Sequence, residues 1–254
     1  MNNKLFDELK HLLPDFSEIN DKGHLQISGL DLVDLVSKFG SPLYIYEENT
    51  IRNLAKSFKE EFESRYKNVH VSYSSKAFSN PALVKILNEE GLGIDVVSRG
   101  ELEVLLRSEF PMNKVNFHGN NKSEEELAEA IDQKIGLITI DSFHEMNILD
   151  KLCEKRAIKQ DIILRLSPSV DPHTHELTST GILDTKFGFS IETGEAKKAL
   201  QISSRKNNLN LKGIHFHLGS PIFELNPYSQ AINYVFDFIK ESYPSSSDLE
   251  TYKI

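Results

Sequence analysis

The sequence has one cysteine, fewer basic than acidic residues and no long apolar run, and each shortage excludes a class of protein. The single thiol, Cys153, cannot form an internal disulfide or a cage of thiolate metal ligands. Acidic residues number 38 against 29 basic ones, a net charge of −9, so no uniform basic surface exists to bind nucleic acid or anionic lipid. No stretch of about 18 apolar residues and no basic, apolar leader is present. These absences predict a soluble cytoplasmic protein that binds neither nucleic acid nor membranes.

The chain from about Lys67 onward alternates short β-rich runs with longer segments of helical periodicity. This alternation is typical of parallel strands joined by crossover helices. Ser123 with Glu126, and Ser142 with Glu145, have the spacing of capping boxes and support two of the helix starts. The predicted strands are 69–74, 94–97, 114–118, 137–140, 162–166 and 211–217, and the predicted helices are 80–90, 100–108, 123–134, 142–155, 193–206 and 226–240.

Polar residues concentrate directly after the predicted strands, at 75–76, 95–98, 118–121, 141–142, 165–168 and 215–220. In a barrel these strand ends form one face, whereas a doubly wound sheet binds its ligand at a single switch point, so the dispersed clusters favour a barrel. A closed barrel of this type needs eight strands, and an open array would expose two long edges. We therefore predict the α/β class, with an incomplete (β/α)8 TIM-type barrel preceded by a segment of a β-domain. The chain is predicted to be a fragment.

The first 46 residues do not follow the alternation. Predicted strands at 25–28 and 42–46 flank a predicted helix at 30–39, which assigns residues 1–46 to the β-domain and residues 47–254 to the barrel. The loop at 167–189, after the fifth predicted barrel strand, is long enough to act as a lid.

Lys76 ends the first predicted barrel strand, within the run 73–77 (YSSKA). At a barrel mouth its neighbours would partly desolvate it, and desolvation favours the nucleophilic neutral amine over the ammonium ion. An imine-forming lysine is therefore one interpretation, and a solvated loop lysine is the other.

His215 and His217 point to the same side of the last predicted strand, because side chains alternate along a strand. With Gly219 and Ser220 they offer an aromatic surface followed by an anion contact from a hydroxyl and backbone N–H groups. A metal site is a rival interpretation, and a purely structural role is another. The candidates for a further metal ligand are Asp95, His118 and Asp141.

Charged residues also lie within and beside apolar strands. Arg165 interrupts the run 162–166 (IILRL), and an arginine inside a barrel needs an anionic partner, either a ligand or an acid. Asp95 and Glu101 flank the end of the second predicted strand, where helix capping is the simplest interpretation, above all for Glu101. Cys153 lies in an amphipathic helix away from the strand ends and is interpreted as a packed thiol.

Taken together, these motifs resemble the fold-type III pyridoxal phosphate decarboxylases, and among them the diaminopimelate decarboxylases. The resemblance extends from about Gly23 to near the end of the sequence, and the combination is far more specific than any single motif. The segments that carry it are, in chain order, 73–77, 93–102, 118–122, 170–176, 180–181, 186–188 and 215–220.

The resemblance implies that pyridoxal phosphate is the cofactor and that it forms an imine with Lys76, the catalytic residue. It also implies that His217 stacks on the pyridine ring, that Ser220 touches the phosphate, and that Lys186 lies near a subunit contact. The implied activity is the decarboxylation of meso-diaminopimelate to L-lysine, by a homodimer when full length and without a metal. The implied cofactor-binding residues are His217, Ser220, Gly219, Arg165 and Asp95.

Two substitutions and four missing segments depart from the family pattern. Arg99 stands where glycine is common and Phe78 where asparagine is common, and neither replaces a group with a chemical task. The family continues with a glycine-rich phosphate loop, a Glu-Pro-Gly-Arg segment, a cysteine-bearing segment and a tyrosine, none of which is in these 254 residues. Each lost proton donor or ring partner is worth roughly two to four orders of magnitude in rate, so little activity is expected of the chain alone.

Three alternatives remain open from the sequence. The first is a fold-type III decarboxylase that acts on ornithine, arginine or carboxynorspermidine. The second is a non-catalytic, single-barrel carrier of pyridoxal phosphate. The third is a degenerate subunit that pairs with a complete partner.

Overall fold

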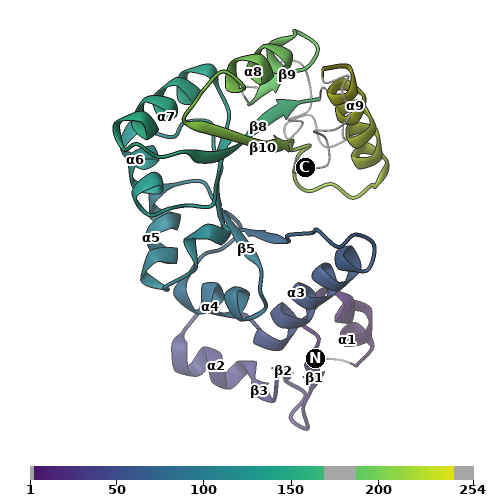
Figure 1. Cartoon of the computed structure of the whole chain (residues 1–254). Coiled ribbons are helices and arrows are strands. Elements are labelled where there is room, and N and C mark those ends of the chain that lie inside the picture. Colours follow the sequence, from purple (N-terminus) through teal and green to yellow (C-terminus); the bar gives the residue numbers. More distant parts are fainter. Residues whose placement is uncertain (1–2, 169–186, 243–254) are drawn as a thin grey trace. The chain divides into compact units, whose positions relative to one another are not determined.

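The computed structural model describes residues 3–168 and 187–242 of the 254-residue chain (Figure 1). The chain divides into two compact units, one made of Met1–Tyr73 and Asn80–Gly93 and the other of Ser74–Ser79 and Ile94–Ile254. The boundary predicted between residues 46 and 47 stays a prediction.

The first unit combines a small antiparallel sheet with helices. Asp31 caps the helix α2 by accepting from the Val33 N–H, and Glu47 caps α3 by accepting from the N–H groups of Asn49 and Thr50. The strands pair in the order β1-β2-β3. Its elements are α1 (Asn3–Leu9), the 3-10 turn η1 (Lys10–Leu12), β1 (Ser17–Ile19), β2 (Leu25–Ile27), β3 (Leu30–Asp31), α2 (Leu32–Phe39), α3 (Glu48–Glu63) and α4 (Pro81–Glu89).

The strand predicted at 42–46 is wrong, because this segment forms an extended connection that pairs with no strand in the described part of the chain. Pro42 has no N–H to donate to a ladder, and Tyr44 is 86% exposed. The apolar residues of this run therefore have no sheet face to cover, and the run leads into the capped start of α3.

A larger sheet contains the six predicted barrel strands. In their spatial order they follow one another along the chain, and the pairs β5-β6, β6-β7, β7-β8 and β8-β10 are parallel. The α/β class is confirmed, since this is the topology of an incomplete (β/α) barrel. The strands are β4 (Ser72–Ser74), β5 (Gly93–Val96), β6 (Val115–Phe117), β7 (Leu137–Ile140), β8 (Gln160–Ser167), the short β9 (Phe189–Ser190), which pairs with β8, and β10 (Leu209–His215).

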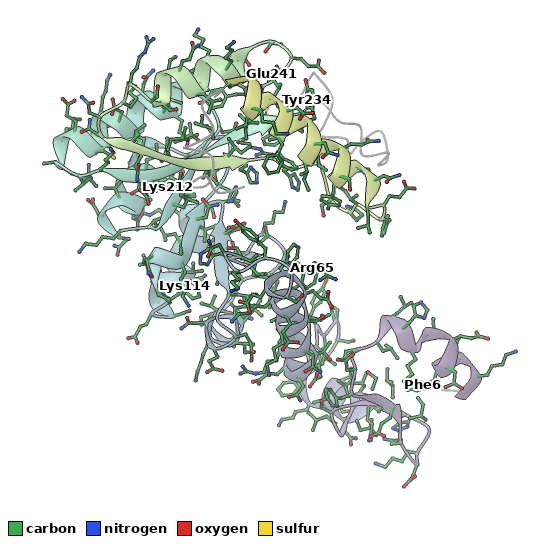
Figure 2. All side chains as sticks on the ribbon, turned by 45° about the vertical axis from the view of Figure 1, so that its right-hand side comes forward. Phe6, Arg65, Lys114, Lys212, Tyr234 and Glu241 are labelled. Carbon is green, nitrogen blue, oxygen red and sulfur yellow. The ribbon has the colours of Figure 1, made fainter. Side chains whose placement is uncertain are left out.

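The crossover helices of the second unit also lie where the sequence places them, with α5 to α8 along one side of the strands (Figure 1). Ser123 and Glu126 form the predicted capping box. Ser142 caps the Glu145 N–H, but the Glu145 carboxylate accepts from the Asp141 N–H, so the second box is only half formed. Tyr234 and Glu241 mark the last helix (Figure 2). The helices are α5 (Arg99–Arg107), α6 (Glu124–Asp132), α7 (Phe143–Lys155), α8 (Glu195–Ser203) and α9 (Asn226–Ser242), with a 3-10 turn η2 (Met112–Lys114).

The larger sheet has one apolar and one polar face. Ile94 and Val96 of β5 are buried, as is Phe117 of β6, whereas the intervening Asp95 and Asn116 are only partly buried. Because side chains alternate along a strand, these polar residues share the face opposite the apolar one. That polar face, and the turns that continue its strands, hold the candidate site.

The helices in the described ranges, 3–168 and 187–242, include none that is both long enough and apolar enough to cross a bilayer.

Candidate functional site

The register of the parallel strands aligns the polar residues at the carboxyl ends of β5 to β10. Asp95 is the partner of Asn116, and His215 is the partner of Arg165. The Lys76 turn follows β4 in the same unit. Residues from distant parts of the sequence therefore meet at one edge, as expected for a barrel mouth.

The turn that carries Lys76 is fastened to the end of β5 through Ser75. The Ser75 N–H donates to the Asp95 carbonyl at 3.0 Å, and Ser75 Oγ lies 2.7 Å from that oxygen and 2.5 Å from Glu101 Oε2. Ser75 is only 3% exposed. Lys76 itself is exposed, so the partial burial expected of it is not found.

Glu101 has a role that the capping interpretation missed. Ser98 caps α5 through the Glu101 N–H, as the sequence suggests, but the Glu101 carboxylate accepts from the Val97 N–H at 2.7 Å and contacts Ser75. The acidic residue in the first turn thus anchors the lysine turn. The sequence signal was the position of Glu101 three residues after its cap, from which a carboxylate reaches backwards.

His118 contacts Asp95 and Asn116 on one side and His215 on the other. Its Nε2 lies 3.4 Å from Asp95 Oδ2 and 2.5 Å from Asn116 Nδ2, and the Asn116 Oδ1 accepts from the Thr139 hydroxyl at 3.0 Å. The His118 ring also meets the ring of His215 edge-on, with centroids 4.6 Å apart. Asn116 and Thr139 were not predicted, because nothing in a strand sequence shows which polar residues face each other across the ladder.

Arg165 has the acidic partner that its place in an apolar strand predicted. Its Nη1 lies 3.4 Å from Asp141 Oδ1, and the two side chains are 11% and 4% exposed. The guanidinium carbon also lies 4.4 Å from the centre of the Phe187 ring. Burial raises the pKa of Asp141, against the lowering effects of the Gly188 N–H and of Arg165. The pair therefore depends on Arg165 to keep a buried carboxylate ionised.

Gly188 gives a local test of how tightly this pair is packed. A Cβ at Gly188, whose φ is +71°, would lie 2.6 Å from the Arg165 carbonyl, whereas a Cβ at Gly194, with φ +81°, would meet nothing within 4 Å. The variants Gly188→Ala and Gly194→Ala both lose about 1–2 kcal/mol of stability, because each puts an L side chain in the left-handed conformation. We expect Gly188→Ala to lose a further ~1–3 kcal/mol of unfolding free energy through crowding, measured by urea denaturation. Equal losses in the two variants would contradict the packing described here.

The two histidines of β10 and its extension lie in an electropositive, partly desolvated setting. Burial and then the charges of Lys76, Arg165 and His118 lower the pKa of His217 to about 4. Burial is the main cause that holds the pKa of His215 well below its usual range, followed by the electrostatic effects of His118, Arg165, His217 and Lys76. Both imidazoles are therefore neutral at pH 7, and the cationic side chains of Lys76 and Arg165 offer charge to an anionic ligand.

The influence of Lys76 on His217 can be measured directly. An NMR titration of the ring protons of His217 should give a midpoint near pH 4 instead of the usual 6.5. We expect Lys76→Ala to raise the pKa of His217, because a nearby positive charge is removed, while Lys151→Ala on the exposed face of α7 leaves it unchanged. An unshifted midpoint in Lys76→Ala would place Lys76 too far from His217 to share a site.

The metal interpretation of the His-x-His pair needs at least one more ligand. In the described ranges no group of three His, Cys, Asp or Glu side chains is arranged to hold a metal ion. His215 Nδ1 is buried, and no residue of the described chain hydrogen-bonds to it. Gly219, with φ +135°, and the exposed Ser220 continue the chain beyond these histidines.

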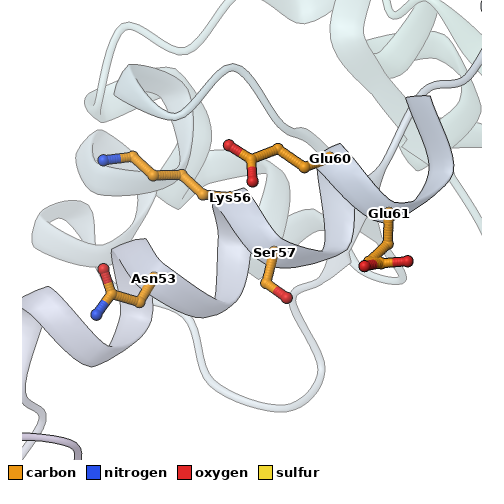
Figure 3. Close-up of a pocket in the computed structure, with 5 residues that line it drawn as sticks. All are labelled: Asn53, Lys56, Ser57, Glu60 and Glu61. Atoms are coloured by element: carbon orange, nitrogen blue, oxygen red, sulfur yellow. The ribbon is translucent and has the colours of Figure 1, made fainter. Parts of the chain in front are cut away.

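A surface depression on α3 is a much poorer candidate for a ligand site than the strand-end cluster. It is lined by residues of this one helix, all exposed (Figure 3). A ligand there would contact exposed, solvated side chains and no buried polar group, so we assign it no role. The lining residues are Asn53, Lys56, Ser57, Glu60 and Glu61.

Comparison with known proteins shows the family to which the chain belongs. The family model described as "Pyridoxal-dependent decarboxylase, pyridoxal binding domain" matches residues 48–252. The chain belongs to the pyridoxal-dependent decarboxylases. It is 43% identical over 225 residues to a diaminopimelate decarboxylase of Bacillus methanolicus, covering 89% of this chain and 52% of that protein. A diaminopimelate decarboxylase of Bacillus subtilis is 41% identical over 225 residues, covering 89% and 51%. This pyridoxal-dependent decarboxylase chain thus spans about half the length of the curated relatives it matches.

Solved structures of such decarboxylases agree with the fold. A diaminopimelate decarboxylase from M. jannaschii, in complex with L-lysine, is 33% identical with a TM-score of 0.81, covering 89% of this chain and 53% of that one. One from Helicobacter pylori, also with L-lysine, is 26% identical with a TM-score of 0.76, covering 87% and 54%. The predicted family and the incomplete barrel are confirmed.

Pyridoxal phosphate is the cofactor of this decarboxylase family, and the residues present fit it. The cluster combines an exposed amine at Lys76, a neutral imidazole at His217, the guanidinium of Arg165, and a buried His215 nitrogen that has no hydrogen-bond partner among the described residues. The individual roles predicted for Lys76, His217, Gly219, Ser220, Arg165 and Asp95 stay predictions. The segments at 170–176 and 180–181, Lys186, and most of the predicted lid lie outside the described residues.

Proposed function

We propose that this chain supplies the lysine-bearing part of the active site of a decarboxylase that converts meso-diaminopimelate to L-lysine and carbon dioxide. The observation that carries the proposal is the strand-end cluster, in which the Lys76 turn is held to the end of β5, the His118 ring meets the His215 ring, and His215 is the strand partner of Arg165. Identities of 43% and 41% to diaminopimelate decarboxylases support the choice of substrate.

The proposed roles follow from the contacts at the strand edge. When bound, pyridoxal phosphate supplies an aldehyde that binds amines covalently and a ring that takes up the electrons released by decarboxylation. Lys76 would hold the aldehyde end, and Ser75, Glu101 and the Asp95 carbonyl keep its turn in place. A neutral His217 would present a flat surface to the ring without adding a charge.

The remaining groups of the site would bind and orient. Arg165 adds positive charge that attracts the phosphate and the substrate carboxylate, while Asp141 fixes its position. Asp95 is held beside His118, 3.4 Å from Nε2, where it balances the cationic cluster. Gly219 and Ser220 would offer a backbone N–H and a hydroxyl to the phosphate.

We also propose that the protein carrying this chain is a cytoplasmic homodimer. The family resemblance supports the homodimer, and the single cysteine fits the reducing cytoplasm. Light scattering at two concentrations should give twice the protomer mass at both, and a protomer mass throughout would contradict it.

The substrate assignment is tested with the protein that carries these 254 residues, loaded with pyridoxal phosphate. Release of carbon dioxide and formation of the amine product are measured in parallel for meso-diaminopimelate, ornithine, arginine and carboxynorspermidine. We expect L-lysine from meso-diaminopimelate and at least roughly 100-fold lower kcat/KM for the others, since they lack its distal carboxylate and a site that binds this group rejects analogues without it. Preferred turnover of ornithine or arginine would overturn the assignment.

A further inference from the structure

Lys122 is a buried lysine that none of the proposed chemical steps uses. Its side chain is 1% exposed, and its ammonium group donates to the Gly119 carbonyl at 2.6 Å and to the Thr139 carbonyl at 2.9 Å. Gly119 directly follows His118 after β6, and Thr139 belongs to β7. One ammonium group therefore joins the ends of two neighbouring barrel strands.

Glu145 completes this connection from the first turn of α7. Its Oε1 lies 2.8 Å from Lys122 Nζ, and its Oε2 accepts from the Asp141 N–H at 3.2 Å. The Glu145 side chain is 5% exposed. The carboxylate thus links the lysine to the residue that pairs with Arg165.

A buried ion pair such as Lys122–Glu145 adds little net stability unless its groups also make hydrogen bonds that an apolar pair could not make. Burying both charges carries a desolvation penalty that their attraction often fails to repay, and an apolar pair of similar volume is commonly as stable. Burial raises the pKa of Glu145 to about 7, against the opposing effect of Lys122. An apolar pair, however, would leave two strand-end carbonyls and the Asp141 N–H without these partners.

We propose that Lys122 and Glu145 are positioning residues, which hold the ends of β6 and β7 so that His118 and Asp141 keep their places in the site. Lys122 acts on His118 through the Gly119 carbonyl, and Glu145 acts on Asp141 through its backbone N–H. Neither residue needs to touch the cofactor. The consequence for pyridoxal phosphate binding rests on the proposed function, whereas the consequence for the strand ends does not.

The test compares Lys122→Met and Glu145→Gln with Lys206→Met. The control removes a similar ion pair in the same unit, because Lys206 Nζ lies 3.1 Å from Asp150 Oδ2 and the two side chains are 23% and 17% exposed. The exchange rates of the amide hydrogens at 118–119 and 139–141 report how often the ends of β6 and β7 open. They are compared with the exchange rates of amides that open only on global unfolding, so that a loss of overall stability is not mistaken for a local effect. Titration with pyridoxal phosphate, followed by absorbance, reports the cofactor affinity.

We expect Lys122→Met to accelerate exchange at these amides by about tenfold or more. We also expect it to weaken pyridoxal phosphate binding by roughly 10–100-fold, the loss of affinity found when a residue that orients a direct ligand is removed from a metal site. Glu145→Gln keeps an acceptor for the Asp141 N–H and should show smaller effects. If Lys122→Met does not fold, Glu145→Gln alone must still show faster exchange at 139–141. Unchanged local exchange in the variants that fold, or changes equal to those of Lys206→Met, would overturn the proposal. If the unmutated protein fails to bind pyridoxal phosphate, the proposed function fails while the exchange data still decide this inference.

Discussion

Replacing Lys76 with alanine is expected to lower decarboxylation by at least about 10³-fold in the protein that carries this chain, the scale seen when an enzyme loses its nucleophile. The loss should fall on kcat, because the amine would act on the bound cofactor and not only on substrate affinity. Stability should change by less than roughly 0.5 kcal/mol, because the Lys76 side chain is exposed. Steady-state kinetics and urea denaturation of the same preparations measure both effects.

The matched control is Lys151→Ala, which removes another exposed lysine from the same unit. It should keep the activity and the stability of the unmutated protein. Near-normal kcat in Lys76→Ala would show that another residue binds the cofactor, and the site would then have to be placed elsewhere.

Replacing Arg165 with methionine is expected to lower the unfolding free energy by about 3 kcal/mol at pH 7, because it leaves Asp141 buried and without its cation. The control is Lys212→Met on the neighbouring strand β10 (Figure 2). This variant removes a pair in which Lys212 Nζ lies 3.8 Å from Asp161 Oδ2, with side chains that are 37% and 41% exposed. That loss should stay within about 1 kcal/mol.

The deficit of Arg165→Met should also depend on pH. The folded state already raises the pKa of Asp141 above its unfolded value, and removing Arg165 raises it further. Between the unfolded pKa of Asp141 and its higher pKa in the folded variant, the folded state binds more protons than the unfolded state. The stability of the variant therefore falls as pH rises through this range and recovers as pH falls. We therefore expect the variant to approach the unmutated protein on acidification. A deficit that stays constant between pH 7 and pH 4 would mean that Asp141 is not the group left uncompensated.

The barrel strands could be predicted from the alternation of hydrophobic periodicity along the chain, and at two helix starts a capping-box spacing gave a second, independent signal. Ser123, for example, both ends a loop and begins a helix with a complete capping box. The strand predicted at 42–46 failed because periodicity alone supported it, while Pro42 and the Glu47 cap favour an extended lead into a helix. The two-residue strand β9 was too short to produce any periodicity.

The candidate site could be predicted only where the type and position of a single residue show that it requires a partner. An arginine in an apolar strand needs an acid, so a partner for Arg165 was expected, but its identity as Asp141 depends on strand register. Ser75 and Glu101 are 26 residues apart, and their contact follows from how α5 returns to the sheet. The buried pairing of Lys122 with Glu145 was not predicted, because surface loops and helix starts usually carry such residues in solvent.

The most direct test of the account is to add pyridoxal phosphate to the folded 254-residue chain, reduce it with borohydride and map the modified peptide by mass spectrometry. Reduction fixes the cofactor on whichever amine has bound its aldehyde. We predict one modified site, Lys76, and no such label in Lys76→Ala. Labelling of another lysine in place of Lys76, or no labelling of a chain shown to be folded, would contradict the assignment of the strand-end cluster as the cofactor site.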